Sequence, residues 1–478
     1  MSADLLVEQQ FDSNIFNKTT DTQSSPITIV RPALRVENTG SLGHARFDGW
    51  LSSHTYWEES TLDGVDRGIS GDIDREILPR VSLFANGSYQ RVAAHDAIRG
   101  ADVVTISGGA PGAPGEPVVT PGQLIEGAVP NVDIAQGEFG TRYLLTPSSK
   151  LTLSGGPYSV DYLGTEVGRP DLRNRDGWFS TAVLDHSLSA LDSISVQVGG
   201  NSTNFEDLII APVPVLNPFD PHEVDLNTGK TTSDQLNLTI GWDRAWTELW
   251  KTHIDVGGRR LHTKTVDALE PVTRVAPGFG FGGDAQPYTD YVPTNSSDVG
   301  PGVIGEMTLE RILPYGSVGL SYSRETRTTS SLAASNVNVD TVSLSYLQHL
   351  SARATLTLFG SYEHYVSANN SAGFAPATYV TNSFNPITGP DYTCSSGTLT
   401  TTGSGANKAG QCSLGASSTL KSDSWIAVAH FDWQLYRRLA TFVTVRYVDR
   451  SGDVKLFGND YNKFNVGIGF RYDYGLYY

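Results

Sequence analysis

Ionisable side chains in this sequence recur at every second position of short alternating segments, so that they share a face with other polar residues. In 425–436, for example, His430 and Asp432 alternate with Phe431 and Trp433. Rings of charged side chains around a water-filled passage select the ions that cross it. The residues that we assign to such a lumen-facing lining are Arg35, Arg46, Asp48, Asp185, Asp243, Lys251, Asp255, Arg259, Glu306, Glu310, Glu363, Asp432, Arg446, Arg471 and Asp473. Their mixed signs predict a mild preference for cations or neutral solutes, and ion pairs that merely support the wall are the alternative.

Two other patterns have the residue types of ligand sites. Gly278, Gly280 and Gly283 have dinucleotide-binding spacing, but such a site needs a preceding strand and a following helix, and neither is predicted. The acidic segments 63–74 and 218–225 offer oxygen ligands for divalent cations, although solvated acidic loops are the simpler interpretation. No Ser/His or Asp/His spacing singles out a hydrolase site. We therefore expect no catalytic residue, no cofactor and no metal site, and we expect that the protein is not an enzyme.

The elements that position these side chains are predicted to be strands. The C-terminal segment 464–478 alternates without a break, with Ile468 and Tyr472 on one face and Gly469 and Arg471 on the other. One face suits hydrocarbon or a second sheet, and the other suits water. No stretch approaches the roughly 18 consecutive apolar residues that a spanning helix needs. A membrane-spanning form would have to be a closed β-barrel, because only helices and barrels pair every backbone group in lipid.

The connections between the predicted strands are of two lengths. Very short ones fall near 77–80, 146–149, 189–192, 245–248, 313–316, 350–353 and 436–439. Long ones rich in Gly, Pro, Ser, Asn and Asp fall at 97–130, 207–231, 268–302 and 371–420. Short periplasmic turns and long extracellular loops are typical of outer-membrane barrels. A soluble sandwich or propeller would also alternate, but it does not predict this asymmetry.

These patterns predict one all-β domain over residues 1–478, a transmembrane antiparallel up-and-down β-barrel. We count about eighteen strands, with sixteen as the alternative, and the even number returns both chain ends to the periplasmic side. A barrel of this size is wide enough for an aqueous channel unless loops or a plug fill it.

Aromatic residues are expected at both edges of the lipid-facing surface. Trp425 and Trp433 are roughly 20 Å apart along the membrane normal after allowing for strand tilt. The predicted lipid-facing girdle consists of Trp425, Trp433, Tyr447, Tyr472, Tyr474 and Tyr478. Inward aromatic residues could stack on sugars, although packing at the wall is the simpler role; they are Trp50, Phe84, Phe442 and Tyr436.

The net charge, the two cysteines and the N-terminal sequence limit the possible partners and cellular compartment of the protein. The net charge of -17 disfavours nucleic acid as a partner, since phosphate binding needs clustered Lys and Arg. Cys394 and Cys412 lie in one Gly/Ser/Thr-rich segment, 393–418, and a disulfide between them would imply an oxidising compartment, with two free thiols as the alternative. The start of the sequence shows no signal peptide, so an exported barrel would have had it removed.

The two ends of the chain resemble a family of outer-membrane β-barrel porins. The segments that carry the resemblance are 10–16, 28–34, 446–451 and 460–478, with an aromatic-Asp-x-Asn stretch at Phe11. Members are often associated with exopolysaccharide or exosortase loci, which implies a role in polysaccharide export. The C-terminus is also similar to the signal read by the barrel-assembly machinery at Arg471, Leu476 and Tyr478, and departs from it at Asp473, where that signal usually has Gly.

Two functions follow as expectations. The first is a porin-like outer-membrane channel of a Gram-negative bacterium for passive passage of small hydrophilic solutes. The second is the barrel component of an envelope complex that exports exopolysaccharide or houses a partner protein. Expected partners are outer-membrane lipid, lipopolysaccharide, the barrel-assembly machinery and, for the second function, a periplasmic or lipoprotein export partner. The transported solute, the state of the pore and the oligomeric state stay open.

Overall fold

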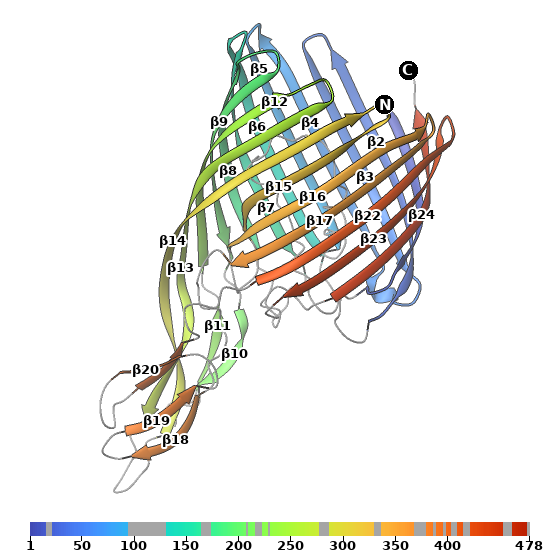
Figure 1. The fold of residues 1–478 in the computed structure, drawn as a ribbon. Helices are drawn as coiled ribbons and strands as arrows, with labels where there is room; N and C mark the ends of the chain where they lie inside the picture. The colour runs from blue at the N-terminus through green and yellow to red at the C-terminus, as the bar shows by residue number, and fades with distance from the viewer. Residues whose placement is uncertain are drawn as a thin grey trace.

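The fold is seen in a computed structural model that describes residues 1–15, 22–93, 131–163, 174–206, 209–215, 222–227, 230–276, 286–328, 336–367, 379–385, 389–394, 398–402, 409–413, 421–452 and 461–475. Eighteen strands join into one antiparallel sheet that closes on itself, which confirms a count of eighteen rather than sixteen (Figure 1). No helix long and apolar enough to cross a membrane occurs among these residues.

The wall strands follow one another around the barrel in chain order. They are β1 (Ser2–Asp12), β2 (Ser25–Gly40), β3 (Gly43–Tyr56), β4 (Gly64–Leu78), β5 (Val81–Ala93), β6 (Asn131–Thr146), β7 (Ser149–Tyr162), β8 (Arg175–Ser187), β9 (Asp192–Phe205), β12 (Lys230–Ala245), β13 (Trp250–Ala276), β14 (Gln286–Leu313), β15 (Gly316–Thr328), β16 (Asn336–Ser351), β17 (Ala354–Ser367), β22 (Lys421–Tyr436), β23 (Leu439–Gly452) and β24 (Tyr461–Gly475). A 3₁₀ turn, η1 (Ser60–Leu62), lies between β3 and β4.

The first and last strands close the barrel. β1 pairs with β2 on one side and with β24 on the other, and the second ladder runs from Ser2 opposite Gly475 to Asp12 opposite Asn465. In this register Leu5 lies opposite Tyr472, so the alternation of the C-terminal segment continues across the closing seam. Closure leaves the sheet without an edge, as lipid requires.

The short connections lie where the sequence predicts them. β4 ends at Leu78 and β5 begins at Val81, and β22 ends at Tyr436 and β23 begins at Leu439. Figure 1 shows both chain ends at the end of the barrel that carries these turns. We call this the turn end, and the opposite one the loop end.

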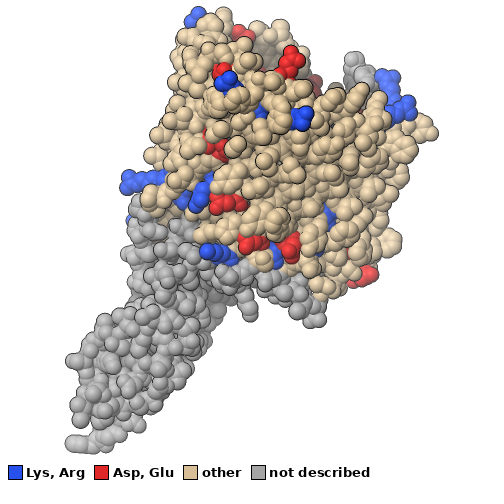
Figure 2. All heavy atoms as spheres, viewed as in Figure 1, with Lys and Arg blue, Asp and Glu red and all other residues tan. Residues whose placement is uncertain are grey.

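The outer face of the wall is apolar through most of its height. Ile240 is 62% exposed and Trp425 is 56% exposed, although both are large hydrophobic side chains. Their sheet neighbours follow the register, so that Ile240 lies beside Val196 and Val256 on adjacent strands. Figure 2 shows few charged side chains in the middle of the front wall. An apolar surface of this extent on the outside of a closed barrel is suited to contact with lipid.

The outer face changes polarity near the loop end. On β4 the outward position after Ile69 is Arg67, and on β22 the outward position after Trp425 is Asp423. We call the outward polar positions above the apolar band the outer collar: Arg67, Arg91, Asp133, Asp161, Asp176, Asp234, Arg324, Asp340, His364, Asp423 and Asp449. The change marks the level at which the wall leaves the hydrocarbon.

At the same end the inward side chains are buried, and apolar and polar ones occur together. We call the apolar ones the inner collar: Ile27, Val92, Val132, Ile134, Val160, Phe179, Val339, Ile426 and Val448. The buried polar ones include Asp12, His54, Asp66, Arg175, Glu363 and Arg450.

Three of the long connections contain more strand than expected. The segment 268–302 continues β13 and β14 as a paired hairpin that runs well beyond the barrel wall, from Ala268 opposite Thr294 to Ala276 opposite Gln286 (Figure 1). The segment 207–231 contains β10 (Ile209–Val215) and β11 (His222–Asn227). The segment 371–420 contains β18 (Tyr379–Asn385), β19 (Gly389–Cys394), β20 (Thr398–Thr402) and β21 (Ala409–Ser413). Pairing of the backbone within each hairpin explains the difference, and the segment 97–130 lies outside the described residues.

A pair of arginine substitutions on β12 tests which face meets lipid. Leu238→Arg places a charge on the outer face in the middle of the apolar band and should lower the free energy of unfolding by about 2–4 kcal/mol. Thr239→Arg faces the interior one residue away and should cost less than about 1 kcal/mol. Reversible denaturant unfolding in a lipid or detergent environment measures both, and equal losses would contradict the assignment of faces.

Candidate pore lining

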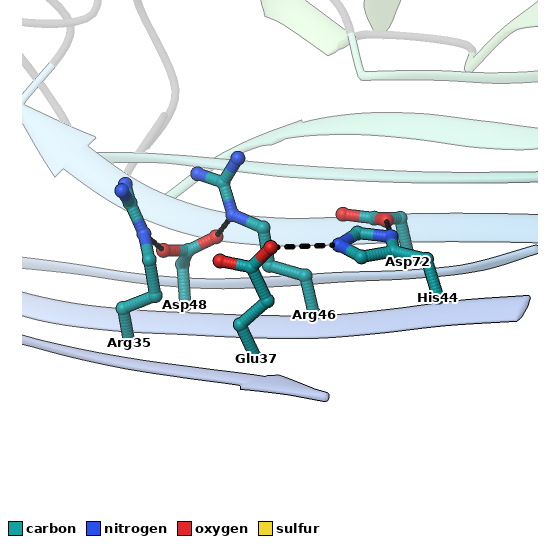
Figure 3. Close-up of polar contacts among 6 residues, drawn as sticks. All are labelled: Arg35, Glu37, His44, Arg46, Asp48 and Asp72. Carbon is teal, nitrogen blue, oxygen red and sulfur yellow. Dashed lines mark hydrogen bonds and ion pairs between the residues drawn. The ribbon is translucent and has the colours of Figure 1, made fainter. Parts of the chain in front are cut away.

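One part of the inner wall carries a chain of charged side chains from neighbouring strands. Arg35 Nε on β2 donates to Asp48 Oδ1 at 2.6 Å, and Arg46 Nε on β3 donates to Asp48 Oδ2 at 2.5 Å. Figure 3 shows the three side chains on the same side of the sheet, with Asp48 between the two guanidinium groups. The contacts arise because Arg35 lies directly opposite Asp48 in the ladder of β2 and β3. Two cations share one carboxylate here, so the local charge is positive.

Toward the turn end the same row of side chains has more carboxylates than cationic groups. His44 lies between two carboxylates, with its Nε2 3.4 Å from Glu37 Oε1 and its Nδ1 3.1 Å from Asp72 Oδ2 (Figure 3). On β4, Asp74 pairs with Arg142 of β6. Positive and negative groups thus alternate along this wall.

A second ionisable group lies across β12 and β13. His253 bridges two carboxylates, with Nδ1 2.6 Å from Asp243 Oδ1 and Nε2 3.0 Å from Asp255 Oδ2. Gly241 has no side chain where the Asp255 carboxylate approaches β12, so the backbone leaves room for it. Glu306 lies opposite Asp255 on β14, and its carboxyl adds to the acidic side. Three carboxylates around one imidazole give this part of the wall a negative character.

Neutral hydroxyl and amide groups cover much of the remaining interior. Ser321 and Ser343 hydrogen bond across β15 and β16 at 2.6 Å, and Gln235 donates to Asn237 at 2.9 Å on β12. In the part of the chain that the structure describes, Thr181 Oγ1, Asn201 Oδ1 and Thr341 Oγ1 have no hydrogen-bond partner. The inward positions of this kind, read from the register, are Thr181, Gln197, Asn201, Gln235, Asn237, Thr239, Ser321, Ser323, Thr341, Ser343, Ser345, Thr357 and Ser361. Such a wall can exchange hydrogen bonds with uncharged polar solutes.

Exposure of the inward side chains falls toward the loop end. Val132, Val160 and Ile27 have no exposed surface, although each faces inward there, and the inward Arg175 is only 3% exposed. At the turn end and in the middle, by contrast, inward groups such as Lys150 and Asp185 keep substantial exposure while they pair at 3.1 Å. The exposed part of the inner wall therefore lies toward the turn end.

The residues predicted to line the lumen all occupy inward positions in the strand register. Several form ion pairs there, including Asp432 with Arg471 at 3.1 Å. Glu363 and Arg259 are buried, whereas Lys251 and Asp473 are exposed near the turn end. Sequence reasoning did not single out Glu37, His44, Asp74, Arg142, Lys150 and His253, although the same alternation places each of them inward.

The predicted girdle residues that the structure describes lie on the outer face. Trp425, Trp433, Tyr447 and Tyr474 are exposed, and Tyr472 and Tyr474 contact each other with ring centroids 5.0 Å apart. Tyr478 lies outside the described residues. Amphipathic rings at the edge of the apolar band suit the interface between lipid and water.

The inward aromatic residues mostly pack against neighbouring cations. The Arg31 guanidinium lies 4.5 Å from the centre of the Trp50 ring, and that of Arg142 lies 4.3 Å from the Phe84 ring. Phe442 is buried against His430. Tyr436 is 74% exposed at the end of β22, next to a shift in the strand register, and its inward direction stays a prediction. The turn to β23 begins there, and alternation ceases to fix the direction of a side chain.

The two cysteines are described by their backbone alone. Cys394 ends β19, where it pairs with Tyr379, and Cys412 lies in β21, where it pairs with Leu399. The disulfide between them stays a prediction. Among the described residues, no group of three or more His, Cys, Asp and Glu side chains could hold a metal ion.

Comparisons with known proteins add little beyond the fold. No protein-family model and no curated protein matches the chain. Similar solved structures include the ferric-catecholate import receptor Fiu from E. coli K12 in its open form (10% identity, TM-score 0.41, 98% of this chain and 81% of that chain). Others are the siderophore receptor PirA from Acinetobacter baumannii (9%, 0.44, 99% and 80%) and the alcaligin outer-membrane receptor FauA from Bordetella pertussis (10%, 0.39, 99% and 76%). Similarity this low carries no argument about function, and the barrel rests on its own strand pairing.

Removal of the shared carboxylate at Asp48 tests whether this wall is exposed to passing ions. Asp48→Asn leaves Arg35 and Arg46 without their anion, so the reversal potential in a salt gradient should move toward chloride. The free energy of unfolding should fall by only about 1 kcal/mol, because both arginines are well exposed.

Asp161→Asn serves as the matched control, since it removes the same charge from the outer collar. It should leave the reversal potential unchanged. A wild-type reversal potential in Asp48→Asn would place this wall outside the ion path.

Proposed function

We propose that the protein is an outer-membrane channel of a Gram-negative bacterium that lets small hydrophilic solutes cross passively, with the turn end in the periplasm. The observation that carries the proposal is the contrast between the two faces of one closed wall. The outer face is apolar and exposed, whereas the inner face carries ion pairs, hydroxyls and amides that remain partly exposed. A polar interior inside an apolar exterior supports a water-filled passage rather than a packed core.

The distribution of charge inside the wall favours neutral or weakly cationic solutes. Around His253 the carboxylates outnumber the cationic groups. On β2 and β3, by contrast, two arginines share the single carboxylate of Asp48. Neither positive nor negative charge dominates the inner wall, and a surface of hydroxyl and amide groups lies between the charged groups. An uncharged polyhydroxylated solute could exchange its hydrogen bonds with water for bonds to this surface without leaving a charge unpaired.

The burial of the inner wall at the loop end favours a second candidate. Apolar inward side chains such as Val132 and polar ones such as Asp12 and Arg175 have little or no exposed surface there. A barrel component of an exopolysaccharide-export complex, or one that houses a partner protein, would be closed on its own and open with its partner. The resemblance of the chain ends to porins associated with exopolysaccharide loci supports the same candidate.

Reconstitution of the purified protein into planar bilayers separates the two candidates. The channel proposal expects stepwise conductance from the protein alone, and faster swelling of liposomes in neutral sugars than in anionic sugars of equal size. The physical reason is that neutral solutes avoid both the carboxylates near His253 and the arginines near Asp48. A closed protein that conducts only with a co-purified envelope partner would exclude the passive channel and favour the second candidate.

A further inference from the structure

The pairing between β14 and β15 ends at a level that coincides with the top of the apolar band. β14 pairs with β15 only from Leu313 opposite Gly316 to Gly305 opposite Arg324. Beyond this level β14 continues with β13 into the projecting hairpin, and β15 continues with β16 up to Thr328 opposite Asn336. The two strands therefore separate along a short seam, which has β14 on one side and the end of β15 on the other.

The sequence at the seam explains the separation. Gly300, Pro301 and Gly302 follow one another on β14, just beyond the last pair with β15. Proline has no N–H to donate to a ladder, and glycine weakens a strand interior. A ladder to β15 would lack a donor at Pro301. The seam opens just beyond Arg324, where the wall has passed from the apolar band to the outer collar.

Arg259 of β13 reaches into this seam. Its Nη2 donates to Asn338 Oδ1 of β16 at 2.6 Å, although β14 and β15 lie between the two strands in the sheet order. A Cβ atom on Gly302 would lie 2.6 Å from Arg259 Nε, so the guanidinium occupies the space that the glycine leaves free. Thr326 also donates to Asn338 Oδ1, at 2.9 Å. The position of the guanidinium is thus defined from both sides of the seam.

The guanidinium of Arg259 is buried with unused donors. Arg259 is 6% exposed, and within the described residues its Nε and Nη1 have no hydrogen-bond partner. Arg324 lies at the last position of β15 that pairs with β14, beside the start of the seam. The carboxylate near Arg324 is Asp340, 3.6 Å away, and it already accepts a hydrogen bond from Tyr322 at 2.9 Å. A buried guanidinium with unfilled donors, as in Arg259, is costly unless an anion lies against it.

The outer face beside the seam adds further positive charge. Arg260 and Lys264 face outward on β13 and are exposed, and Arg260 lies opposite Pro301. Figure 2 shows basic side chains where the projecting hairpin leaves the front wall. Elsewhere in the outer collar an arginine can be fully engaged, as Arg91 is by Asp133 through two contacts of 2.5 Å. On a chain with net charge -17, this group of cations is a local exception.

We propose that the seam between β14 and β15 binds a phosphate group, held by Arg259 and Arg324 and approached from the outer face past Arg260. A phosphate oxygen accepts hydrogen bonds from a guanidinium fork in bidentate geometry, and Arg is the residue suited to it. The seam lies at the boundary of the apolar band, where the headgroups of the outer leaflet are. The phosphate comes either from the headgroup of an outer-leaflet glycolipid or from a soluble phosphate, and the experiment distinguishes the two.

Binding of diphosphoryl lipid A to the full chain in detergent micelles, measured by native mass spectrometry, tests the site. Arg259→Gln and Arg324→Gln should each weaken binding about tenfold, the loss expected for one charge-assisted contact. Arg67→Gln is the matched control, because it removes an exposed outer-collar arginine on β4 and should change binding less than about twofold. Equal losses in all three variants, or none in the first two, would overturn the proposal.

Gly302→Ala separates a built site from general attraction between charges. It keeps every arginine but places a methyl group where the Arg259 guanidinium lies, so binding should weaken as it does in Arg259→Gln. Wild-type binding in this variant would contradict the geometry. Circular dichroism and heat-modifiable migration on gels establish that each variant is folded.

Inorganic phosphate is the second probe. Displacement of lipid A by millimolar phosphate in the wild type but not by chloride, with the same dependence on Arg259, assigns the site to phosphate as such. Retention of lipid A against inorganic phosphate assigns it to the glycolipid headgroup. Failure of both probes to bind in an arginine-dependent way would sink the proposal, whatever the conductance of the barrel.

Discussion

The requirement that every backbone N–H and C=O find a partner in lipid governs this structure. A β-sheet meets it only by closing, and the ladder between β1 and β24 provides that closure through eleven paired positions, from Ser2 to Asp12. Once the sheet is closed, each side chain has one of two directions, and alternation along the strand decides which. The polar lumen and the apolar exterior are thus consequences of one hydrogen-bonding constraint acting on one sequence pattern.

The level at which this constraint ends is visible in the side chains. Below the outer collar, outward residues such as Ile69 and Trp425 meet lipid, and the interior is polar. Above it, outward residues such as Arg67 and Asp423 meet water, and inward residues are buried whether they are apolar, as Val132 is, or charged, as Arg175 is. Because the hydrophobic effect places apolar side chains where water is absent, the change on the outer face shows where the wall leaves the hydrocarbon. The outer face therefore defines the position of the wall in the membrane.

Much of the wall could be predicted from alternation and turn length, because both depend on neighbouring residues. The turn at 436–439 and the inward direction of Asp432 follow from this local pattern. Pairings across the barrel were not predictable, since the contact of Arg35 with Asp48 depends on the register of β2 and β3 and that of His253 with Asp243 on β12 and β13. The hairpin over 268–302 was missed for a related reason, as its Gly and Pro content resembles that of a loop although its backbone is paired.

β14 and β15 stay paired within the apolar band and separate only above it, at the seam. Within the apolar band an unpaired stretch of ladder would expose backbone groups to hydrocarbon at a cost of several kcal/mol for each group. The break occurs only after Arg324, where water and headgroups can satisfy those groups. Gly300, Pro301 and Gly302, which are unsuited to a strand interior, lie beyond this level on β14. A departure from regular pairing at this level costs little and leaves room for Arg259 to cross the wall.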